Sequence, residues 1–177
     1  MVDSAELGTA ESPVANVAMH FGFLMMPEYT LSTFSNAVSV LRMANRLSGR
    51  ELYRYSVFSL DGEPVVSSAG LELRLDGSLK SIGDMNVLMV CGGYNVKDYC
   101  SKSMLDELRA MDKKKIPLGG MCTGSYVLAA AGLLDGYRST IHWENIASMR
   151  EQFPKLNISS SLFVIDRDRY TCSGGIS

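Results

Sequence analysis

The amino-acid sequence predicts an α/β fold: a three-layer sandwich whose mostly parallel sheet is doubly wound. Two observations support this prediction. Nearly continuous apolar runs, such as 17–26 and 86–93, are typical of strands that are covered on both faces. Segments with helical periodicity alternate with these runs along the chain. Because parallel neighbours need a crossover, this alternation indicates helices packed against both faces of one sheet.

The predicted elements follow one another in that order. The run at 17–26 is the first strand, and the spacing of Leu31, Phe34 and Val38 predicts a helix that ends at Gly49. The charged residues 166–169 are expected to form a solvated turn. Further strands are predicted at 53–60, 86–93, 116–122, 159–166 and 169–173, and further helices at 103–115, 123–136 and 142–153.

Length and charge limit the class of protein. The 177 residues suit one domain, which we place at 17–177 after a flexible tail at 1–16. The last residues read as a loop after a strand, so we expect a part of a longer protein. A net charge of −2 gives no general attraction to nucleic acid or to a membrane surface. With no apolar run of about 18 residues and no secretory signal, we expect a cytoplasmic protein without a membrane partner.

The cysteine and histidine pattern indicates neither a metal site nor a disulfide framework. No two cysteines have CxxC spacing, and no histidine stands at a spacing typical of metal ligands. Only His20 and His142 are available as a histidine base. Free thiols are therefore expected at Cys91, Cys100, Cys122 and Cys172.

The stretch from Gly120 to Gly124 has the pattern G-x-C-x-G between a predicted strand and a predicted helix. Small residues allow a sharp turn there that exposes the central side chain, as in a nucleophile elbow. A cysteine at a helix N-terminus is also favoured as thiolate. The alternative is that Cys122 is only a small packed residue.

Two other segments could complete a site. Gly92, Gly93 and Tyr94 follow a predicted strand, and their backbone amides could hold an oxyanion or a ligand carboxylate. The alternative for this glycine pair is an ordinary tight turn. His142 could orient a ligand or act as a base, and the alternative is a partly buried structural histidine. For Trp143 the alternative is packing in the core.

Residues 120–144, together with the segments around Gly92 and Pro27, resemble the PfpI/ThiJ superfamily, which has the class I glutamine amidotransferase-like fold. More narrowly, residues 17–176 are similar to the GlxA branch of AraC-type transcriptional regulators, including regulators of glycine betaine, carnitine and arginine catabolism. The resemblance implies a flavodoxin-like sheet and a sensor domain that works as a homodimer. It also implies that DNA is contacted only through a separate C-terminal domain with two helix-turn-helix motifs, which this sequence does not contain.

Departures from the enzymes of that superfamily indicate lost catalysis. Active relatives have an acidic residue in the first helix, and Thr33 stands at that position. A threonine cannot exchange a proton as a carboxylic acid does. Protease-like members have histidine after the cysteine, where this chain has Thr123, and isonitrile hydratase-like members have threonine there but keep the acid. Glu28 precedes the helix and is a poor substitute.

We therefore expect a catalytically inactive, effector-sensing domain without metal or cofactor. The expected effector is a betaine, a carnitine or an amino acid. Its carboxylate would lie at the Gly92–Gly93 amides and at the N-terminus of the elbow helix, and its cation at Glu144 or at aromatic rings of Trp143, Tyr94 and Phe34. The alternative function is a cysteine-dependent hydratase or amidase, and a redox sensor at Cys122 ranks third. The expected ligand-binding residues are Thr33, Gly92, Gly93, Tyr94, Cys122, Thr123, His142, Trp143 and Glu144.

Overall fold

A computed structural model of the chain describes residues 18–81 and 83–175, so the predicted tail at 1–16 lies outside the described residues. The main sheet has seven strands in the order β3-β2-β1-β4-β5-β9-β8. Only β8 runs antiparallel to its neighbour. This order steps outward from β1 in both directions, which is the doubly wound, flavodoxin-like arrangement that the sequence predicted.

The first crossover forms as expected. β1 (Met19–Met25) pairs in parallel with β2 (Tyr53–Ser59) on one side and with β4 (Val87–Cys91) on the other. Between β1 and β2 the chain forms α1 (Leu31–Ser48), which ends at Gly49 with φ +66°. Glycine adopts this left-handed conformation without steric cost, which confirms the predicted end of the helix.

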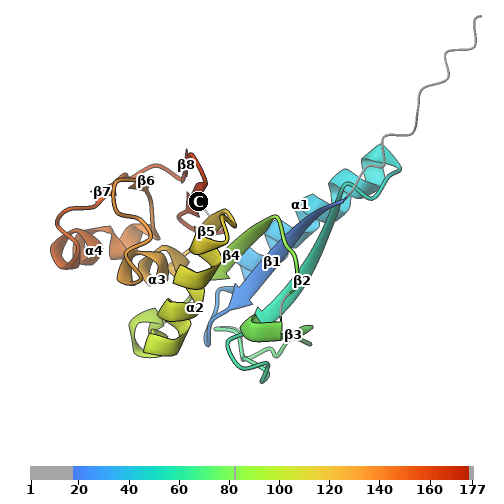
Figure 1. Cartoon of the computed structure of the whole chain (residues 1–177), viewed down its shortest axis with the longest axis horizontal. Helices are drawn as coiled ribbons and strands as arrows, with labels where there is room; N and C mark the ends of the chain where they lie inside the picture. The colour runs from blue at the N-terminus through green and yellow to red at the C-terminus, as the bar shows by residue number, and fades with distance from the viewer. Residues whose placement is uncertain (1–17, 82, 176–177) are drawn as a thin grey trace, which may run out of the picture.

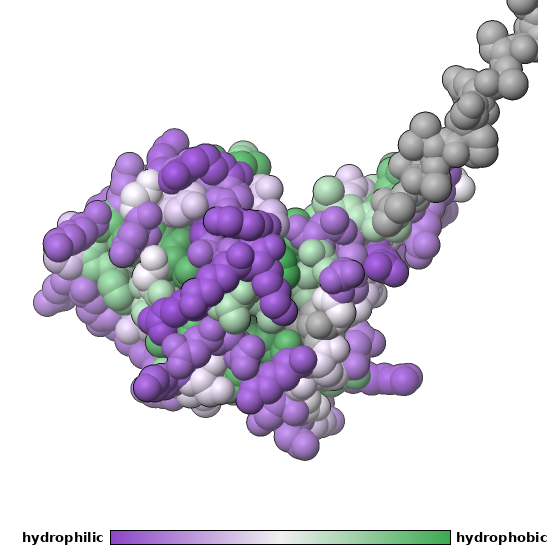
Figure 2. Space-filling model, in the orientation of Figure 1, coloured by the Kyte–Doolittle hydropathy of each residue, from purple (hydrophilic) through white to green (hydrophobic). Residues whose placement is uncertain are grey.

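Alternating side chains of β1 and of Met26, which follows it, contribute to a hydrophobic core on each face of the sheet. Phe23 and Met25 belong to the cluster that contains Phe34 of α1. Leu24 and Met26 belong to the other cluster, with residues of α2 (Lys102–Lys113) and α3 (Gly124–Ala130). The sheet therefore lies between α1 on one face and α2 and α3 on the other, so the predicted layers are confirmed (Figure 1). Hydrophilic side chains dominate the outer surface of the molecule on the α2 side (Figure 2).

The later strands complete the sheet. β5 (Leu118–Met121) pairs with β4 and with β9 (Arg169–Cys172), and β8 (Phe163–Asp166) forms the edge. Three short strands lie outside the predicted set because each has only two residues and no apolar run of its own. They are β3 (Gly77–Ser78), β6 (Arg138–Ser139) and β7 (Asn157–Ile158).

Two predicted helices are shorter than expected. The helix expected at 123–136 is α-helical only through α3, because turns follow it and Gly132 and Gly136 both have φ +73°. The helix expected at 142–153 begins as a 3-10 turn, η3 (Trp143–Asn145), and continues as α4 (Ile146–Gln152). Two more 3-10 turns, η1 (Leu79–Ser81) and η2 (Val96–Tyr99), were not predicted. None of the helices in the described ranges is both long and apolar enough to cross a membrane.

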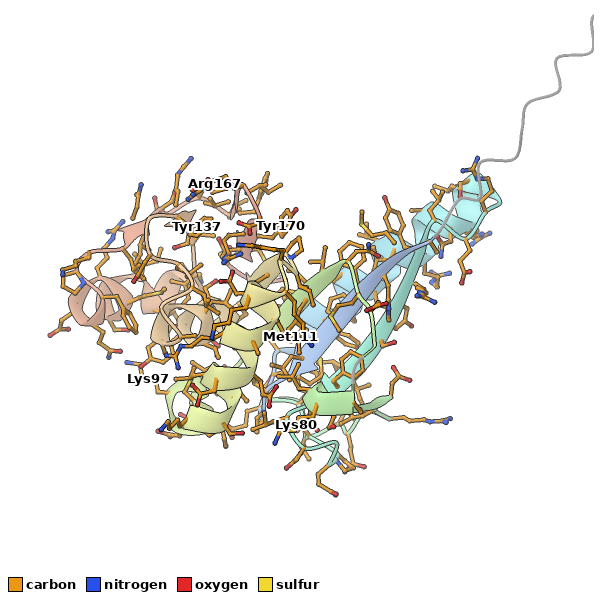
Figure 3. The ribbon with its side chains drawn as sticks, in the orientation of Figure 1. Lys80, Lys97, Met111, Tyr137, Arg167 and Tyr170 are labelled. Atoms are coloured by element: carbon orange, nitrogen blue, oxygen red, sulfur yellow. The ribbon has the colours of Figure 1, made fainter. Side chains whose placement is uncertain are left out.

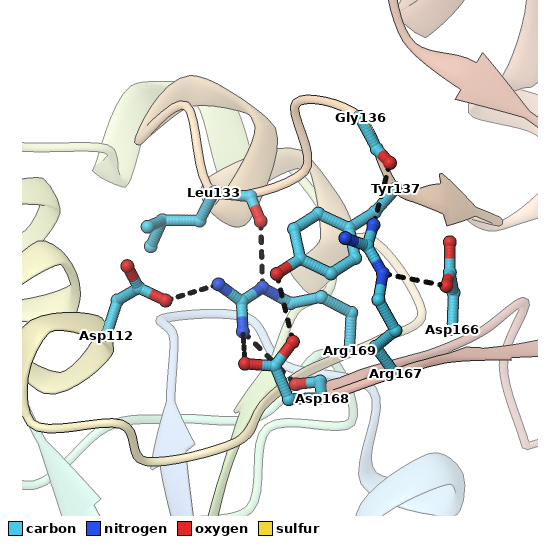
Figure 4. A network of polar contacts seen from close by, with 8 residues as sticks. All are labelled: Asp112, Leu133, Gly136, Tyr137, Asp166, Arg167, Asp168 and Arg169. Atoms are coloured by element: carbon cyan, nitrogen blue, oxygen red, sulfur yellow. Dashed lines mark hydrogen bonds and ion pairs between the residues drawn. The ribbon is translucent and has the colours of Figure 1, made fainter.

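The turn at 166–169 forms, but one of its arginines is not solvated. The side chain of Arg169 is only 3% exposed, and it contacts Asp112 of α2, Asp168 and the carbonyl oxygen of Leu133 (Figure 4). Its guanidinium also lies 4.7 Å from the centre of the Tyr137 ring. A buried guanidinium needs such partners, so this arginine ties α2, the segment after α3 and β9 together.

Acid weakens this cluster through Asp168. Burial acts to raise the pKa of the Asp168 carboxyl, but the hydrogen bond from Tyr137 and the charge of Arg169 outweigh burial and hold the pKa below its ordinary value. The stabilisation from Asp168 is therefore present above the ordinary pKa of an aspartate and is lost as the pH falls through the lowered pKa.

The Tyr137 and Arg167 side chains lie in the upper part of Figure 3, and Lys97 lies in the lower part, beside the cavity described next.

Candidate functional site

A cavity of about 500 Å³ opens where the chain leaves β1 and β4 toward opposite sides of the sheet. In open α/β sheets, ligands bind at this switch point, outside the carboxyl ends of the strands. An isolated bridge between Tyr29 and Gly93 holds the two loops together. The residues that line the cavity are Thr30, Ser32, Thr33, Ser68, Gly93, Tyr94, Asn95, Val96, Lys97, Asp98, Cys122, Thr123, His142, Glu144, Asn145, Gly174 and Gly175.

Cys122 occupies a strained turn between β5 and α3, as the G-x-C-x-G pattern predicted. Its φ is +57°, a left-handed conformation that is uncommon outside glycine. A Cβ at Gly120 would lie 2.4 Å from the Ser125 nitrogen, and one at Gly124 would lie 2.0 Å from the Val90 oxygen. Only glycine fits at both positions, so the sharp turn is confirmed, but the predicted exposure of its central side chain is wrong because Cys122 is buried.

The expected thiolate at Cys122 is not supported. Burial raises the pKa of the Cys122 thiol above its ordinary value, and this effect outweighs the hydrogen bonds from Thr30 and from the Thr123 backbone, which lower it. The Thr30 hydroxyl donates to the Cys122 sulfur over 3.4 Å. Cys122 is only 6% exposed, so water does not solvate a thiolate there, and burial disfavours the charged form. At neutral pH the thiol is the favoured form.

Thr33 lies in the first turn of α1 and lines the cavity, as predicted. Its side chain is 4% exposed, and its hydroxyl has no hydrogen-bond partner among the described residues. Glu28, the nearby carboxylate, accepts a hydrogen bond from Asn95 over 2.9 Å. Thr30, rather than a carboxylate, is the side chain that hydrogen-bonds the Cys122 sulfur.

The two glycines after β4 have different roles. Gly93 lines the cavity, and a Cβ there would lie 1.7 Å from the Glu28 oxygen, so its backbone must pass close to the other loop. The prediction for Gly92 is wrong, because Gly92 lies outside the lining. Its amide already donates to the Met121 oxygen over 3.1 Å, and a Cβ there would lie 2.3 Å from the Gly124 nitrogen. Gly92 serves close packing against the elbow.

Thr123 and Tyr94 line the cavity, as predicted, in different ways. The Thr123 hydroxyl donates to the Gly93 oxygen over 2.7 Å and so fixes the elbow to the loop after β4. Tyr94 is 70% exposed and stands at the open side of the cavity. Phe34, considered as an aromatic contact, is buried in the core beneath α1 instead.

The segment after the elbow supplies His142 and Glu144 to the lining, as predicted. The His142 amide donates to the Cys122 oxygen over 3.3 Å, and its Nδ1 lies 3.6 Å from Glu144 Oε2. Trp143 was predicted as a lining residue, and this is wrong. It is 67% exposed, so core packing is also wrong for it, and its ring centre lies 5.7 Å from that of His142.

Sequence reasoning missed part of the wall. Ser32, Ser68, Asn145 and the stretch Asn95–Asp98 line the cavity without belonging to any motif. Gly174 and Gly175 offered a signal, since a glycine pair after the last strand of a parallel sheet lies at the same edge as the other glycine pairs. Within the described ranges, no group of three or more His, Cys, Asp or Glu side chains could hold a metal ion.

Comparisons with known proteins agree with this geometry. The HTH-type transcriptional regulator GbdR of Pseudomonas aeruginosa is 45% identical over 154 residues, which cover 87% of this chain and 42% of GbdR. A crystal structure of an AraC family transcriptional regulator from Pseudomonas putida has a TM-score of 0.79 and 31% identity, covering 89% of this chain and 84% of that one.

One similar protein is an enzyme. The isonitrile hydratase of Pseudomonas putida is 30% identical over 128 residues, which cover 72% of this chain and 54% of the hydratase. The chain thus spans about half the length, or less, of these curated relatives. A sequence model of the DJ-1/PfpI family matches residues 23–175, and the chain therefore belongs to the DJ-1/PfpI family.

Proposed function

We propose that this chain is the effector-sensing part of an AraC-type transcriptional regulator, in which the cavity beside Cys122 binds a ligand without converting it. The observation that carries the proposal is the state of the elbow. Its cysteine is held as a thiol, and the side chains that replace the acid around it, Thr30 and Thr33, are hydroxyls. A nucleophilic mechanism needs a group that takes the thiol proton, and a neutral hydroxyl does not do so.

The lining supports a small, polar effector with both charges, such as a betaine, a carnitine or an amino acid. Most lining side chains are hydroxyls, amides or charged groups, with Lys97 of one sign and Asp98 and Glu144 of the other. The aromatic rings expected to contact the ligand's cation are those of Trp143, Tyr94 and Phe34. Of these three, only Tyr94 lines the cavity. Carboxylates therefore carry more of the expected cation recognition than aromatic faces do.

The regulator's output requires parts beyond this domain. GbdR is more than twice as long as the segment that matches this chain, and we infer that DNA is bound by a separate helix-turn-helix domain of a homodimer in the cytoplasm. Effector binding would then shift a two-state equilibrium in that assembly, provided that the effector binds the two states with different affinity.

Calorimetric titration with glycine betaine, carnitine and arginine tests the ligand site. Ser68 is an exposed lining residue, so Ser68→Trp should fill part of the cavity without disturbing the core. Ser103→Trp is the matched control, because Ser103 is exposed on α2 and lies outside the lining. We expect one of the three ligands to bind the wild type and Ser103→Trp alike and to bind Ser68→Trp at least tenfold more weakly. Equal binding to both variants would place the site elsewhere.

A second candidate function is a cysteine-dependent hydratase or amidase, which the preserved elbow and the similarity to isonitrile hydratase favour. Turnover assays with simple amides and isonitriles test it. We expect no turnover above a mock preparation. Turnover that Cys122→Ala abolishes would make the enzyme the better assignment.

A further inference from the structure

The first turn of α1 faces the cavity with an uncompensated positive end. α1 has 18 residues, and no acidic residue stands in its first turn. Its N-cap, Thr30, accepts no side-chain capping bond from the helix amides, and the Thr30 hydroxyl donates to the Cys122 sulfur. In the part of the chain that the structure describes, the amides of Leu31, Ser32 and Thr33 donate to no acceptor. The helix dipole and these free amides together favour an anion.

A second, independent observation at the same place indicates a ligand. Thr33 is 4% exposed, yet its hydroxyl has no partner among the described residues. A buried hydroxyl without a partner costs about 1–3 kcal/mol, so such groups are normally satisfied by water or by a ligand. A Cβ built at Gly174 would lie 3.9 Å from the Thr33 hydroxyl oxygen and 3.5 Å from His142 Cδ2. Gly174 and His142 both line the cavity, so the hydroxyl lies along the cavity wall.

The Gly92 amide and the N-terminus of α3, which the sequence also indicates as anion-binding groups, are weaker candidates. The Gly92 amide already donates to the Met121 oxygen. The elbow helix α3 has only seven residues, so its dipole is less developed than that of α1. Glu144 lines the cavity near His142 and would repel an anion placed beside it, but it suits the cationic end of a small zwitterion.

We propose that the first turn of α1 holds the carboxylate of the effector, through the Thr33 hydroxyl and the free amides of this turn. The inference rests on the proposed function for the location of the ligand, and it adds the ligand's orientation. A carboxylic acid at position 33 would bring its own negative charge to the helix end and would repel the ligand's carboxylate.

An NMR titration of the 177-residue chain with sodium acetate tests this seat, with sodium chloride at matched ionic strength as the reference. We expect saturable shifts of the Ser32 and Thr33 amides with acetate in the wild type and in Thr33→Ser. Thr33→Asp should weaken acetate binding at least tenfold. The matched control is Ser35→Asp, which adds the same charge to the same helix at an exposed position outside the lining. Ser35→Asp should change acetate binding less than threefold.

Thr33→Val keeps the shape of the side chain without the hydroxyl or a new charge, and it should also weaken acetate binding. If Thr33→Asp fails to fold, Thr33→Val still tests whether the Thr33 hydroxyl contributes to acetate binding. Equal weakening in Thr33→Asp and Ser35→Asp, shifts confined to the Gly93 and Thr123 amides, or no saturable shift would each overturn the proposal. If acetate binds here while betaine, carnitine and arginine fail in calorimetry, the anion seat stands and the choice of effectors is wrong.

Discussion

At the scale of single residues, burial of the Cys122 sulfur sets the chemistry of the elbow. Thr30 donates a hydrogen bond to the sulfur, and burial raises the thiol pKa further than that bond lowers it. A thiol in this state is a poor nucleophile at neutral pH, since the thiolate is the reactive form. The turn is therefore preserved as a shape that presents a side chain and backbone to the cavity.

The rate of alkylation by iodoacetamide measures the protonation state of the Cys122 thiol. We expect Cys122 to react slowly at pH 7 and faster as the pH rises above 9, because its raised pKa keeps the thiol protonated below that range. Thr30→Val should slow the reaction further, since it removes a hydrogen bond that favours the thiolate, and Thr30→Ser should leave the rate unchanged. Peptide mass spectrometry reads the rate at Cys122 itself. Fast alkylation at pH 7 would contradict the assignment.

Single residues were predictable where a local motif fixes the backbone. Cys122, Thr123 and Gly93 were found because glycines beside a strand end restrict the turn. Trp143 and Gly92 lie outside the lining, because Trp143 is exposed and Gly92 packs against the elbow with its amide bonded to the Met121 oxygen. Neither feature has a signal in the surrounding sequence.

At the scale of elements, the loop after β1 and the loop after β4 pack in close contact at the cavity. Gly93→Ala would place a Cβ 1.7 Å from the Glu28 oxygen, which is backbone and cannot move aside cheaply. We expect the free energy of unfolding to fall by about 3 kcal/mol or more. Gly83→Ala is the matched control, because a Cβ there meets nothing within 4 Å. Urea denaturation of both variants checks this, and equal stability would show that the loops are looser than described.

The buried arginine is a second element-scale feature. Arg169→Met should destabilise the fold by about 3 kcal/mol, because it breaks a buried ion pair that joins β9 to α2. Arg167→Met is the control, since Arg167 is 59% exposed and its pair with Asp166 should contribute less than about 1 kcal/mol. Thermal unfolding of both variants distinguishes them. A smaller loss in Arg169→Met than in Arg167→Met would contradict the role given to Arg169.

Long elements were predictable because the periodicity of apolar residues sets them. The strands of the parallel sheet and α1 and α2 lie where apolar runs and helical spacing placed them. The two-residue strands are held by pairing with distant segments, so no local pattern marks them. The shortened α3 follows from glycines whose left-handed turns end the helix earlier than apolar spacing alone indicated.

At the scale of the whole molecule, the order of strands decides where ligands meet the protein. Motifs that lie far apart in the sequence, in α1, after β4, at the elbow and after β9, converge on one cavity. The sequence predicted the convergence of the first three, because the carboxyl ends of parallel strands share an edge, but it did not predict the contribution of Gly174 and Gly175 after β9. It did not predict the remaining wall, since Ser68 arrives through a long loop without regular structure.

The net charge of the chain predicts that it does not bind DNA specifically by itself. With a net charge of −2, the 177-residue chain should not retard a DNA fragment specifically in a gel at physiological salt. A full-length helix-turn-helix regulator with its own DNA site is the positive control. Specific retardation by the 177-residue chain alone would contradict the division of roles proposed above.

The central claim, that the Cys122 cavity binds an effector without converting it, is tested most directly by one calorimetric comparison. Glycine betaine, carnitine and arginine are each titrated into the wild type and into Cys122→Ala. We predict that at least one ligand gives saturable heat in both proteins, with the signal returning to baseline after every injection. Absence of binding by all three at millimolar concentration, or continuing heat in the wild type that disappears in Cys122→Ala, would contradict the claim.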